Sequence, residues 1–140
     1  MIKANPIFAK SALVVPAAGN SARMGNDKAM MLLPSGKTML WTILQSYHDT
    51  GLEKFVVTLR PGVAGEFSGL IRQTGWNLEI VEANADGLGT RFQSIRAGIE
   101  ACAGAERVFI HNVDNPFVFP FLLKRMIIQA QPGAYVVPVF

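Results

Sequence analysis

A phosphate-binding loop is predicted where an apolar run meets a short basic segment. The run 12–15 (Ala-Leu-Val-Val) is typical of a buried strand, and the segment 16–28 that follows contains two glycines, Arg23 and Lys28. Glycine lets the backbone approach an anion closely, so consecutive N–H groups can point at phosphate oxygens. The guanidinium and ammonium groups would neutralise the phosphate charge. The alternative is a surface turn whose charges are solvated.

The spacing of the glycines excludes two well-known phosphate-binding patterns. Gly19 and Gly25 are too far apart for the dinucleotide fingerprint G-x-G-x-x-G, and Lys28 does not directly follow the second glycine as in a Walker loop. The segment instead resembles the signature loop of the nucleotidyltransferases that make activated sugars, isoprenoid precursors and the molybdenum cofactor. That loop has the pattern A-A-G-x-S-x-R-M-G followed shortly by lysine. The matching residues are Ala17, Ala18, Gly19, Ser21, Arg23, Met24, Gly25 and Lys28.

The resemblance is closest to the MobA-like NTP transferases, which include the cytidylyl and guanylyl enzymes of molybdenum-cofactor synthesis. It implies that Arg23 and Lys28 are catalytic, because they neutralise the charge that grows on the pyrophosphate. It also implies that the loop around them binds the nucleotide. The residues concerned are Ala17, Ala18, Gly19, Asn20, Ser21 and Gly25.

A metal ligand is predicted at Asp114, where the apolar run 108–113 ends. Mg²⁺ prefers oxygen ligands, commonly one or two carboxylates together with substrate phosphates. In the related enzymes a strand ending in Asp-x-Pro carries such an aspartate, and Asp114-Asn115-Pro116 is similar. These residue types also favour an ordinary turn, so a structural role for Asp114 is the alternative interpretation.

A third polar group lies in the glycine-rich segment 83–90 and the predicted helix after it. Molybdenum-cofactor nucleotidyltransferases carry a similar segment, which implies that it binds the nucleotide. The residues concerned are Asn84, Gly87, Gly89 and Ser94. The two glycines would let a base lie against the backbone, and the serine could hydrogen-bond a base edge. Equally, Thr90 could be the N-cap of the helix and Ser94 an ordinary helix serine, so both interpretations stay open.

The histidines and the cysteine are assigned structural roles. His111 stands beside the predicted site, but we expect a histidine with satisfied hydrogen bonds rather than a general base. His48 is expected at the surface. Cys102 is the single cysteine, which excludes an internal disulfide framework and a cysteine-rich metal site. It should pack as a small apolar residue, and the lone thiol indicates a reducing cytoplasm.

Strands and helices alternate along the chain, which predicts an α/β fold. We expect a Rossmann-like, three-layer α/β/α domain with a mainly parallel sheet, of the nucleotide-diphospho-sugar transferase type. Strands are predicted at 12–15, 55–59, 78–81, 108–113 and 135–139, and helices at 38–47, 66–73, 91–101 and 120–131. The loops after the first, third and fourth strands leave carboxyl ends, so they can converge on one crevice.

The ends and buried faces of the helices follow from residue type and spacing. Thr38 is the predicted N-cap of the first helix, and Gly51 should close it. The expected buried residues are Leu40, Ile43, Leu44 and Tyr47 in the first helix, Phe92, Ile95 and Ile99 in the third, and Phe121, Leu122, Met126 and Ile127 in the fourth.

The composition indicates a single globular domain over residues 1–140. Half of the residues are hydrophobic and 16% are charged, which excludes a disordered chain. The net charge is +3, but the basic residues are scattered, so a phosphate-bearing small molecule suits the chain better than nucleic acid. No apolar run reaches the ~18 residues of a membrane span, and no signal-like segment precedes the first strand, so no membrane partner is expected.

Together these features predict a nucleotidyltransferase. It would bind CTP or GTP with Mg²⁺ and transfer the nucleotidyl group to a phosphorylated small molecule, with a molybdopterin-like cofactor as the favoured acceptor. One alternative is a cytidylyltransferase of isoprenoid or sugar-nucleotide synthesis, whose loop also begins Pro-Ala-Ala-Gly, as residues 16–19 do here. The other alternative is a non-catalytic nucleotide-binding module.

The related enzymes usually continue beyond the point where this chain stops. Their later part contains a second acidic metal ligand and much of the acceptor pocket. We therefore expect this chain to lack the usual C-terminal portion and, with it, the second metal ligand. The predicted strand 135–139 would leave an exposed sheet edge, which favours a homodimer or poor solubility.

Overall fold

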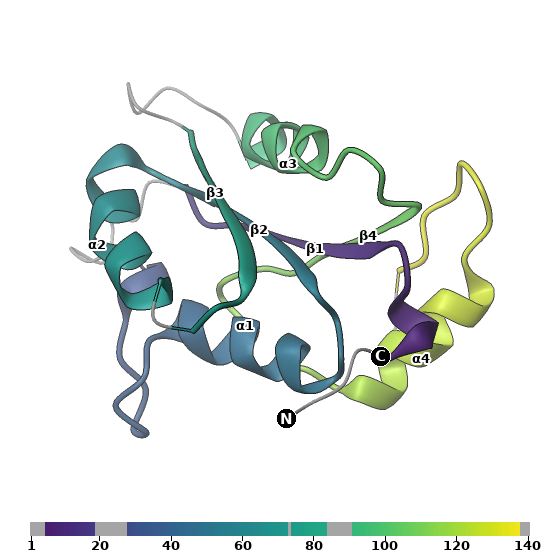
Figure 1. The fold of residues 1–140 in the computed structure, drawn as a ribbon, viewed down its shortest axis with the longest axis horizontal. Coiled ribbons are helices and arrows are strands. Elements are labelled where there is room, and N and C mark those ends of the chain that lie inside the picture. The colour runs from purple at the N-terminus through teal and green to yellow at the C-terminus, as the bar shows by residue number, and fades with distance from the viewer. Residues whose placement is uncertain (1–4, 19–27, 73, 84–90, 138–140) are drawn as a thin grey trace.

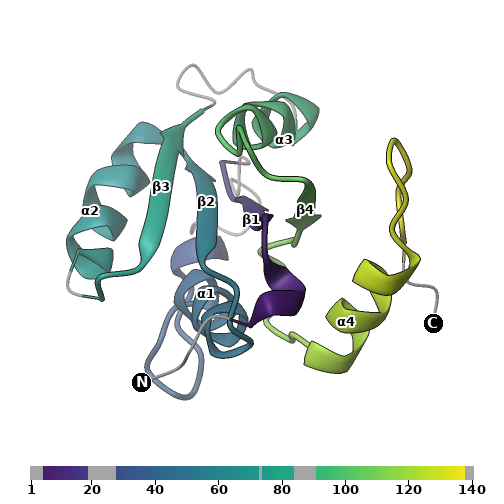
Figure 2. The same cartoon turned by 45° about the vertical axis from the view of Figure 1, so that its right-hand side comes forward.

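A parallel sheet forms the centre of the computed structural model. The residues that the structure describes are 5–18, 28–72, 74–83 and 91–137. The strands are β1 (Ser11–Pro16), β2 (Lys54–Leu59), β3 (Asn77–Glu82) and β4 (Arg107–Ile110). They lie in the order β3-β2-β1-β4, as Figures 1 and 2 show, and each neighbouring pair is parallel. The predicted parallel sheet is therefore confirmed.

Helices cover both faces of this sheet. They are α1 (Met39–Asp49), α2 (Pro61–Ile71), α3 (Arg91–Glu100) and α4 (Pro120–Gln129), with short 3-10 turns η1 (Pro6–Phe8) and η3 (Lys28–Met30). Figure 1 shows α3 above the sheet and α1 below it, which is the predicted three-layer arrangement. Among the described residues, no helix is long and apolar enough to cross a membrane.

Each face of β1 contributes to a separate core, because successive side chains of a strand point to opposite faces. Leu13 and Val15 belong to the larger cluster, which also contains residues of α1, α2 and α4. Ala12 and Val14 belong to a smaller cluster together with Cys102. The expected packing of Cys102 as a small buried residue is confirmed, and every residue of β1 is buried.

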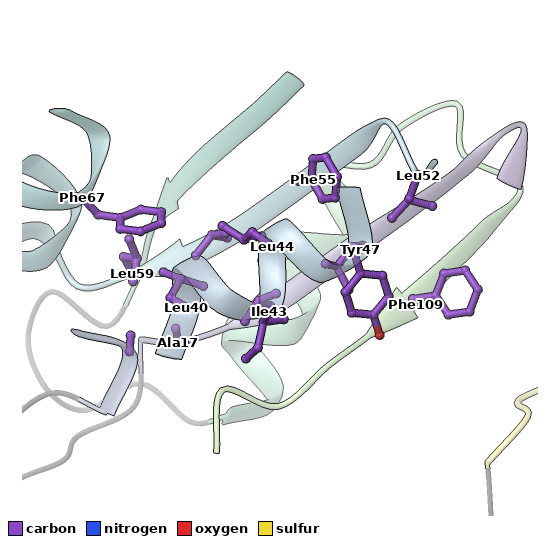
Figure 3. Close-up of a cluster of buried hydrophobic side chains, with 14 of the residues drawn as sticks. Ala17, Leu40, Ile43, Leu44, Tyr47, Leu52, Phe55, Leu59, Phe67 and Phe109 are labelled. Atoms are coloured by element: carbon purple, nitrogen blue, oxygen red, sulfur yellow. The ribbon is translucent and has the colours of Figure 1, made fainter. Parts of the chain in front are cut away.

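Helix α1 buries the face that its apolar spacing predicts. Leu40, Ile43, Leu44 and Tyr47 are all buried, and Figure 3 shows them within the larger cluster. The spacing of these residues brings them onto one side of an α-helix, so their burial fixes how α1 lies on the sheet.

Both ends of α1 are also as predicted. The Thr38 hydroxyl oxygen accepts a hydrogen bond from the Trp41 N–H at 3.0 Å, which satisfies one of the free donors at the start of the helix. Gly51 follows the helix with φ +96°, in the left-handed region that favours glycine.

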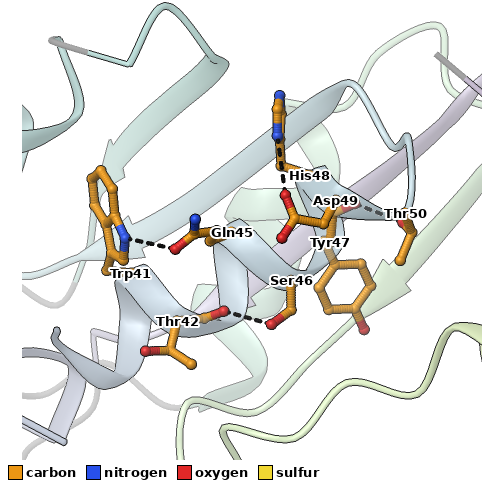
Figure 4. A network of polar contacts seen from close by, with 8 residues as sticks. All are labelled: Trp41, Thr42, Gln45, Ser46, Tyr47, His48, Asp49 and Thr50. Atoms are coloured by element: carbon orange, nitrogen blue, oxygen red, sulfur yellow. Dashed lines mark hydrogen bonds and ion pairs between the residues drawn. The ribbon is translucent and has the colours of Figure 1, made fainter. Parts of the chain in front are cut away.

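The other sides of α1 carry aromatic contacts and polar contacts, and Figure 4 shows the polar ones together with Tyr47. The Trp41 Nε1–H donates to Gln45 Oε1 at 3.1 Å. The His48 ring stacks on Trp76 with 4.9 Å between the ring centroids, so His48 is half-buried rather than fully exposed. Tyr47 and His48 point away from each other in Figure 4.

Helix α3 contradicts the predicted burial pattern. Phe92 is 72% exposed, Ile99 is 42% exposed and Ile95 is only half-buried, whereas Ser94 and Gly98 are buried. The physical reason is a close approach of the helix to the sheet. A Cβ atom at Gly98 would overlap the Val14 Cγ1 atom. Only small residues fit on this side, so the large apolar side chains of α3 point outward.

The C-terminal third of the chain differs from the prediction in three places. Strand β4 ends at Ile110 rather than at 113, because a turn closed by the Asn115 N–H and the Asn112 carbonyl begins soon afterwards. Helix α4 buries Leu123, while Phe121 is 73% exposed, because α4 lies at the edge of the sheet and only one side of it meets the core. A strand was predicted at 135–139, of which the structure describes residues 135–137. These residues form no strand, and none of the described strands pairs with them.

Helix α2 begins earlier than predicted. The sequence predicts a helix over 66–73, but the helix starts at Pro61. Proline suits the first helical position, because its φ is already helical and its missing N–H would be unpaired there in any case.

We expect Gly98→Ala to destabilise the protein by about 1–3 kcal/mol, because the new methyl group overlaps the stiff, fully buried Val14 side chain. The matched control is Gly65→Ala in α2, where a Cβ would meet nothing within 4 Å. This control should gain about 0.5–1 kcal/mol from the higher helix propensity of alanine. Urea unfolding measures both, and equal effects of the two substitutions would contradict the close packing of α3.

Candidate nucleotide site at the carboxyl edge of the sheet

The segments after β1 and β4 leave the same edge of the sheet, because these strands are parallel neighbours. After β1, Ala17 and Ala18 are still buried, and the Ala17 N–H donates to the Thr58 carbonyl oxygen at 2.9 Å. This bond continues the pairing with β2 and fixes where the chain leaves the sheet. The predicted loop therefore begins at the carboxyl edge, as expected.

Most residues of the predicted nucleotide site lie outside the described residues. From the first loop these are Gly19, Asn20, Ser21, Arg23 and Gly25, and from the segment after β3 they are Asn84, Gly87 and Gly89. The roles of these residues stay predictions. The described members of the site are Ala17, Ala18, Lys28, Ser94 and Asp114.

Lys28 and Asp114 lie side by side, although they are far apart in the sequence. The Lys28 Nζ atom is 3.3 Å from the Asp114 Oδ1 atom, and the two side chains are 40% and 59% exposed. An ion pair with this much exposure to water is weak, so it can open when another charged group arrives. The predicted phosphate-binding cation and the predicted metal ligand thus share one place at the edge of the sheet.

The turn that contains Asp114 is held by its neighbour Asn115 rather than by Asp114 itself. The Asn115 Oδ1 atom accepts a hydrogen bond from the Phe117 N–H at 3.0 Å, and the Asn115 N–H donates to the Asn112 carbonyl. The turn that was the alternative interpretation for this stretch is therefore present. It does not use the Asp114 carboxylate, which instead contacts Lys28.

The donor set fits a divalent cation only if the substrate provides further ligands. In the described residues there is no group of three histidine, cysteine or acidic side chains that could hold a metal ion. Asp114 offers one exposed carboxylate. Mg²⁺ is commonly held by one or two carboxylates, water and substrate phosphates, so a single aspartate suits a metal that arrives with a triphosphate.

Ser94 lies in the first turns of α3 and is 5% exposed. It is one helical turn before Gly98, on the side of α3 that packs closely on the sheet. A contact between Ser94 and a base stays a prediction.

A partly buried hydrogen-bonded pair lies beside the Asp114 turn. The Tyr47 hydroxyl lies 2.9 Å from His111 Nδ1, and His111 Nε2 lies 2.7 Å from the Asn115 carbonyl oxygen. A carbonyl oxygen only accepts, so Nε2 carries the proton, and Nδ1 accepts from the tyrosine. The predicted satisfied histidine is confirmed. The sequence did not reveal Tyr47 as its partner, because a tyrosine on the apolar face of a helix is indistinguishable from core.

Burial sets the protonation of this pair. It lowers the pKa of His111, and the hydrogen bond to the Asn115 carbonyl opposes this only in part. Burial also raises the pKa of Tyr47 well above its ordinary value. The histidine is therefore neutral and the tyrosine remains a hydroxyl at neutral pH, as the hydrogen-bond directions require.

The sheet and its helices place the chain in the Rossmann-like class of nucleotide-diphospho-sugar transferase folds. The 4-diphosphocytidyl-2C-methyl-D-erythritol synthase of Anaerococcus prevotii has the same fold with a TM-score of 0.69 and 19% identity, covering 89% of this chain and 52% of that one. The Rv0371C protein of Mycobacterium tuberculosis, solved in complex with manganese, matches with a TM-score of 0.60 and 24% identity over 84% of this chain and 57% of that one.

The chain belongs to the MobA-like NTP transferase domain family, whose model matches residues 13–140. The family inferred from the signature loop is thus confirmed. The 2-C-methyl-D-erythritol 4-phosphate cytidylyltransferase of Bacteroides fragilis is 30% identical over 132 residues. That similarity covers 93% of this chain and 59% of the relative, so the chain spans less than two thirds of that protein's length.

We expect acid to destabilise the wild type more than a His111→Gln variant. The unfolded chain binds a proton at His111 near pH ~6.5, whereas the folded chain resists protonation because the pKa of His111 is lowered. Stability from this group is therefore present above pH ~6.5 and is lost as the pH falls below it.

Urea unfolding at about pH 7.5 and about pH 5.5 measures the difference. A His48→Gln variant is the control and should keep the pH dependence of the wild type, since His111 is intact. Equal pH dependence in the wild type and His111→Gln would contradict the lowered pKa and the neutral state of His111 in the folded protein.

Proposed function

We propose that this chain forms the nucleotide-binding part of a nucleotidyltransferase. It would bind a nucleoside triphosphate with a divalent metal, Mg²⁺ in the first instance, and transfer the nucleotidyl group to a phosphorylated small molecule. The observation that carries the proposal is the contact between Lys28 and Asp114 at the edge where the signature loop begins. Membership of the MobA-like NTP transferase domain family supports the same reaction class.

The proposed reaction is an in-line displacement at the α-phosphorus. An oxygen of the acceptor's phosphate forms a bond to the α-phosphorus, while the bond to the bridging oxygen breaks and pyrophosphate leaves with that electron pair. Arg23 and Lys28 would stabilise the charge that develops on the pyrophosphate. Asp114 would hold the metal, which when bound neutralises phosphate charge and orients the triphosphate.

The Lys28–Asp114 ion pair can be replaced by contacts to a bound metal–triphosphate complex. Without ligand, each side chain neutralises the other at 3.3 Å. A metal–triphosphate complex carries both a cation for Asp114 and anionic oxygens for Lys28. Binding would therefore replace one weak, exposed ion pair with two charge-assisted contacts, and no unpaired charge is left behind.

For the donor and acceptor, we propose CTP and a phosphorylated sugar alcohol. The similarity to the Bacteroides fragilis cytidylyltransferase, which is named for 2-C-methyl-D-erythritol 4-phosphate, supports this donor and acceptor. It supports them over the molybdopterin-like acceptor that the resemblance of the signature loop favours. A molybdopterin-like acceptor with CTP or GTP keeps the support of the family resemblance. A non-catalytic nucleotide-binding module is the third candidate, and it would bind the nucleotide without releasing pyrophosphate. The lone, buried Cys102 agrees with a cytoplasmic site of action.

Calorimetry with CTP, GTP, ATP and UTP, each with and without Mg²⁺, tests the proposal. We expect binding of CTP that Mg²⁺ strengthens. Adding 2-C-methyl-D-erythritol 4-phosphate to that complex should then release pyrophosphate. Metal-dependent binding without pyrophosphate release would favour the non-catalytic module, and failure of all four nucleotides to bind would contradict the proposal.

The same measurement with Asp114→Asn should show nucleotide binding that no longer responds to Mg²⁺. Glu106→Gln is the matched control, because Glu106 forms a similar ion pair with Lys10 at 3.2 Å, with side chains 67% and 58% exposed. This control should keep the metal dependence of the wild type. Unchanged metal dependence in Asp114→Asn would remove Asp114 as a ligand.

We also propose that the chain forms a homodimer through the outer side of β4. In the described sheet β4 pairs with β1 alone, and Ile110, Phe117 and Phe119 nearby are 42%, 66% and 56% exposed. Unpaired strand edges and exposed apolar groups favour association. Sedimentation velocity should show a dimer that Ile110→Lys weakens, and a clean monomer at high protein concentration would contradict it.

A further inference from the structure

We propose that Tyr47 and His111 are positioning residues that hold the Asp114 turn in place for metal binding. This inference rests on the proposed function for its metal, but the hydrogen bonds that carry it do not depend on any ligand. They connect the buried face of α1 to the exposed turn that contains the predicted ligand.

His111 ties both ends of the turn. Its backbone N–H donates to the Val14 carbonyl oxygen at 3.1 Å, which fixes the start of the turn to the end of β1. Its ring Nε2–H donates to the Asn115 carbonyl oxygen at 2.7 Å, four residues further on. The segment between them is thus a closed loop, and Asp114 is inside it, directly before the residue that the ring holds.

Tyr47 fixes the ring that closes this loop. Its hydroxyl donates to His111 Nδ1 at 2.9 Å, and the two rings meet edge to face with 5.4 Å between centroids. Tyr47 is only 3% exposed and also packs near Phe109, with ring centroids 6.2 Å apart. Because Tyr47 cannot move without disturbing the core, it sets both the rotation and the tautomer of the imidazole.

The position of Asp114 follows from this chain of contacts. Asp114 itself is exposed, and its contact with Lys28 is an exposed ion pair that restrains it weakly. The rigid attachment comes instead from the neighbouring peptide, through the His111 ring to the core. In metal sites, groups that orient a ligand without touching the metal commonly change metal affinity by about 10–100-fold when they are removed.

The test uses Tyr47→Phe, which removes the hydroxyl and keeps the ring. Ser46→Ala is the matched control. It removes a hydroxyl from the same helix, and this hydroxyl donates to the Thr42 carbonyl oxygen at 2.8 Å instead of to a histidine (Figure 4). Thermal unfolding first confirms that both variants are folded.

The first readout is amide hydrogen exchange without any ligand. Tyr47→Phe should speed exchange at the Asn115 and Phe117 N–H groups about tenfold, while Ser46→Ala should leave both rates unchanged. Nitrogen NMR of the wild-type ring should show His111 neutral with the proton on Nε2. Unchanged exchange in Tyr47→Phe, or a proton on Nδ1, would overturn the inference whatever the protein binds.

The second readout is the Mg²⁺ concentration needed for CTP binding. Tyr47→Phe should need about tenfold more Mg²⁺, with the affinity for CTP in the absence of metal unchanged. A purely structural role would lower stability without moving the Mg²⁺ requirement. The double variant Tyr47→Phe/His111→Gln should be no worse than His111→Gln alone, because the two side chains act as one unit, and additive losses would overturn the inference.

The two readouts separate this inference from the proposed function. If the wild type shows no metal-dependent binding of nucleotide, the proposed function fails, and exchange at Asn115 and Phe117 still decides whether Tyr47 and His111 hold the turn. If the wild type binds CTP with Mg²⁺ but Tyr47→Phe changes neither exchange nor the Mg²⁺ requirement, the positioning role alone is wrong.

Discussion

Strand β1 is enclosed along both edges and on both faces, and the rest of the structure depends on this constraint. It has hydrogen-bonded neighbours on both edges, and apolar clusters cover both of its faces. A chain leaving such a strand can reach solvent only beyond its end. Because β4 runs parallel beside β1, the turn after β4 reaches the same place. Lys28 and Asp114 meet there for topological reasons that need no special local sequence.

The sequence predicted helices best where size decides which face is buried. Leu40, Ile43 and Leu44 of α1 face a large cluster that has room for bulky side chains, so their spacing alone identifies the inner face. Helix α3 follows another rule. It lies so close to Val14 that Gly98 is needed, and large apolar residues are excluded from the contact. Apolar periodicity carries no information about the distance between a helix and a sheet, which is why this face could not be predicted.

Much of the candidate site could be predicted as a set of residues, but its internal connections could not. Lys28 and Asp114 were recognisable from the signature loop and the end of an apolar run. The structure confirms the turn, which Asn115 holds, and leaves the Asp114 carboxylate in contact with Lys28, so the ligand role of Asp114 stays a prediction. The burial of Tyr47 was predicted, but its hydrogen bond to His111 was not. The hydroxyl is the only sign of this role, and its partner lies far along the chain.

The place of β4 in the sheet links the candidate site to folding. The pairs β1–β2 and β2–β3 join successive strands, whereas β4 follows β3 in the chain but lies beside β1. Such non-local pairing carries a larger loop-closure cost and is expected to form late. Lys28 and Asp114 become neighbours only when this last strand has docked. A ligand that contacts both residues would bind only molecules in which β4 is paired with β1. Raising the ligand concentration would therefore increase the fraction of molecules in which β4 is docked.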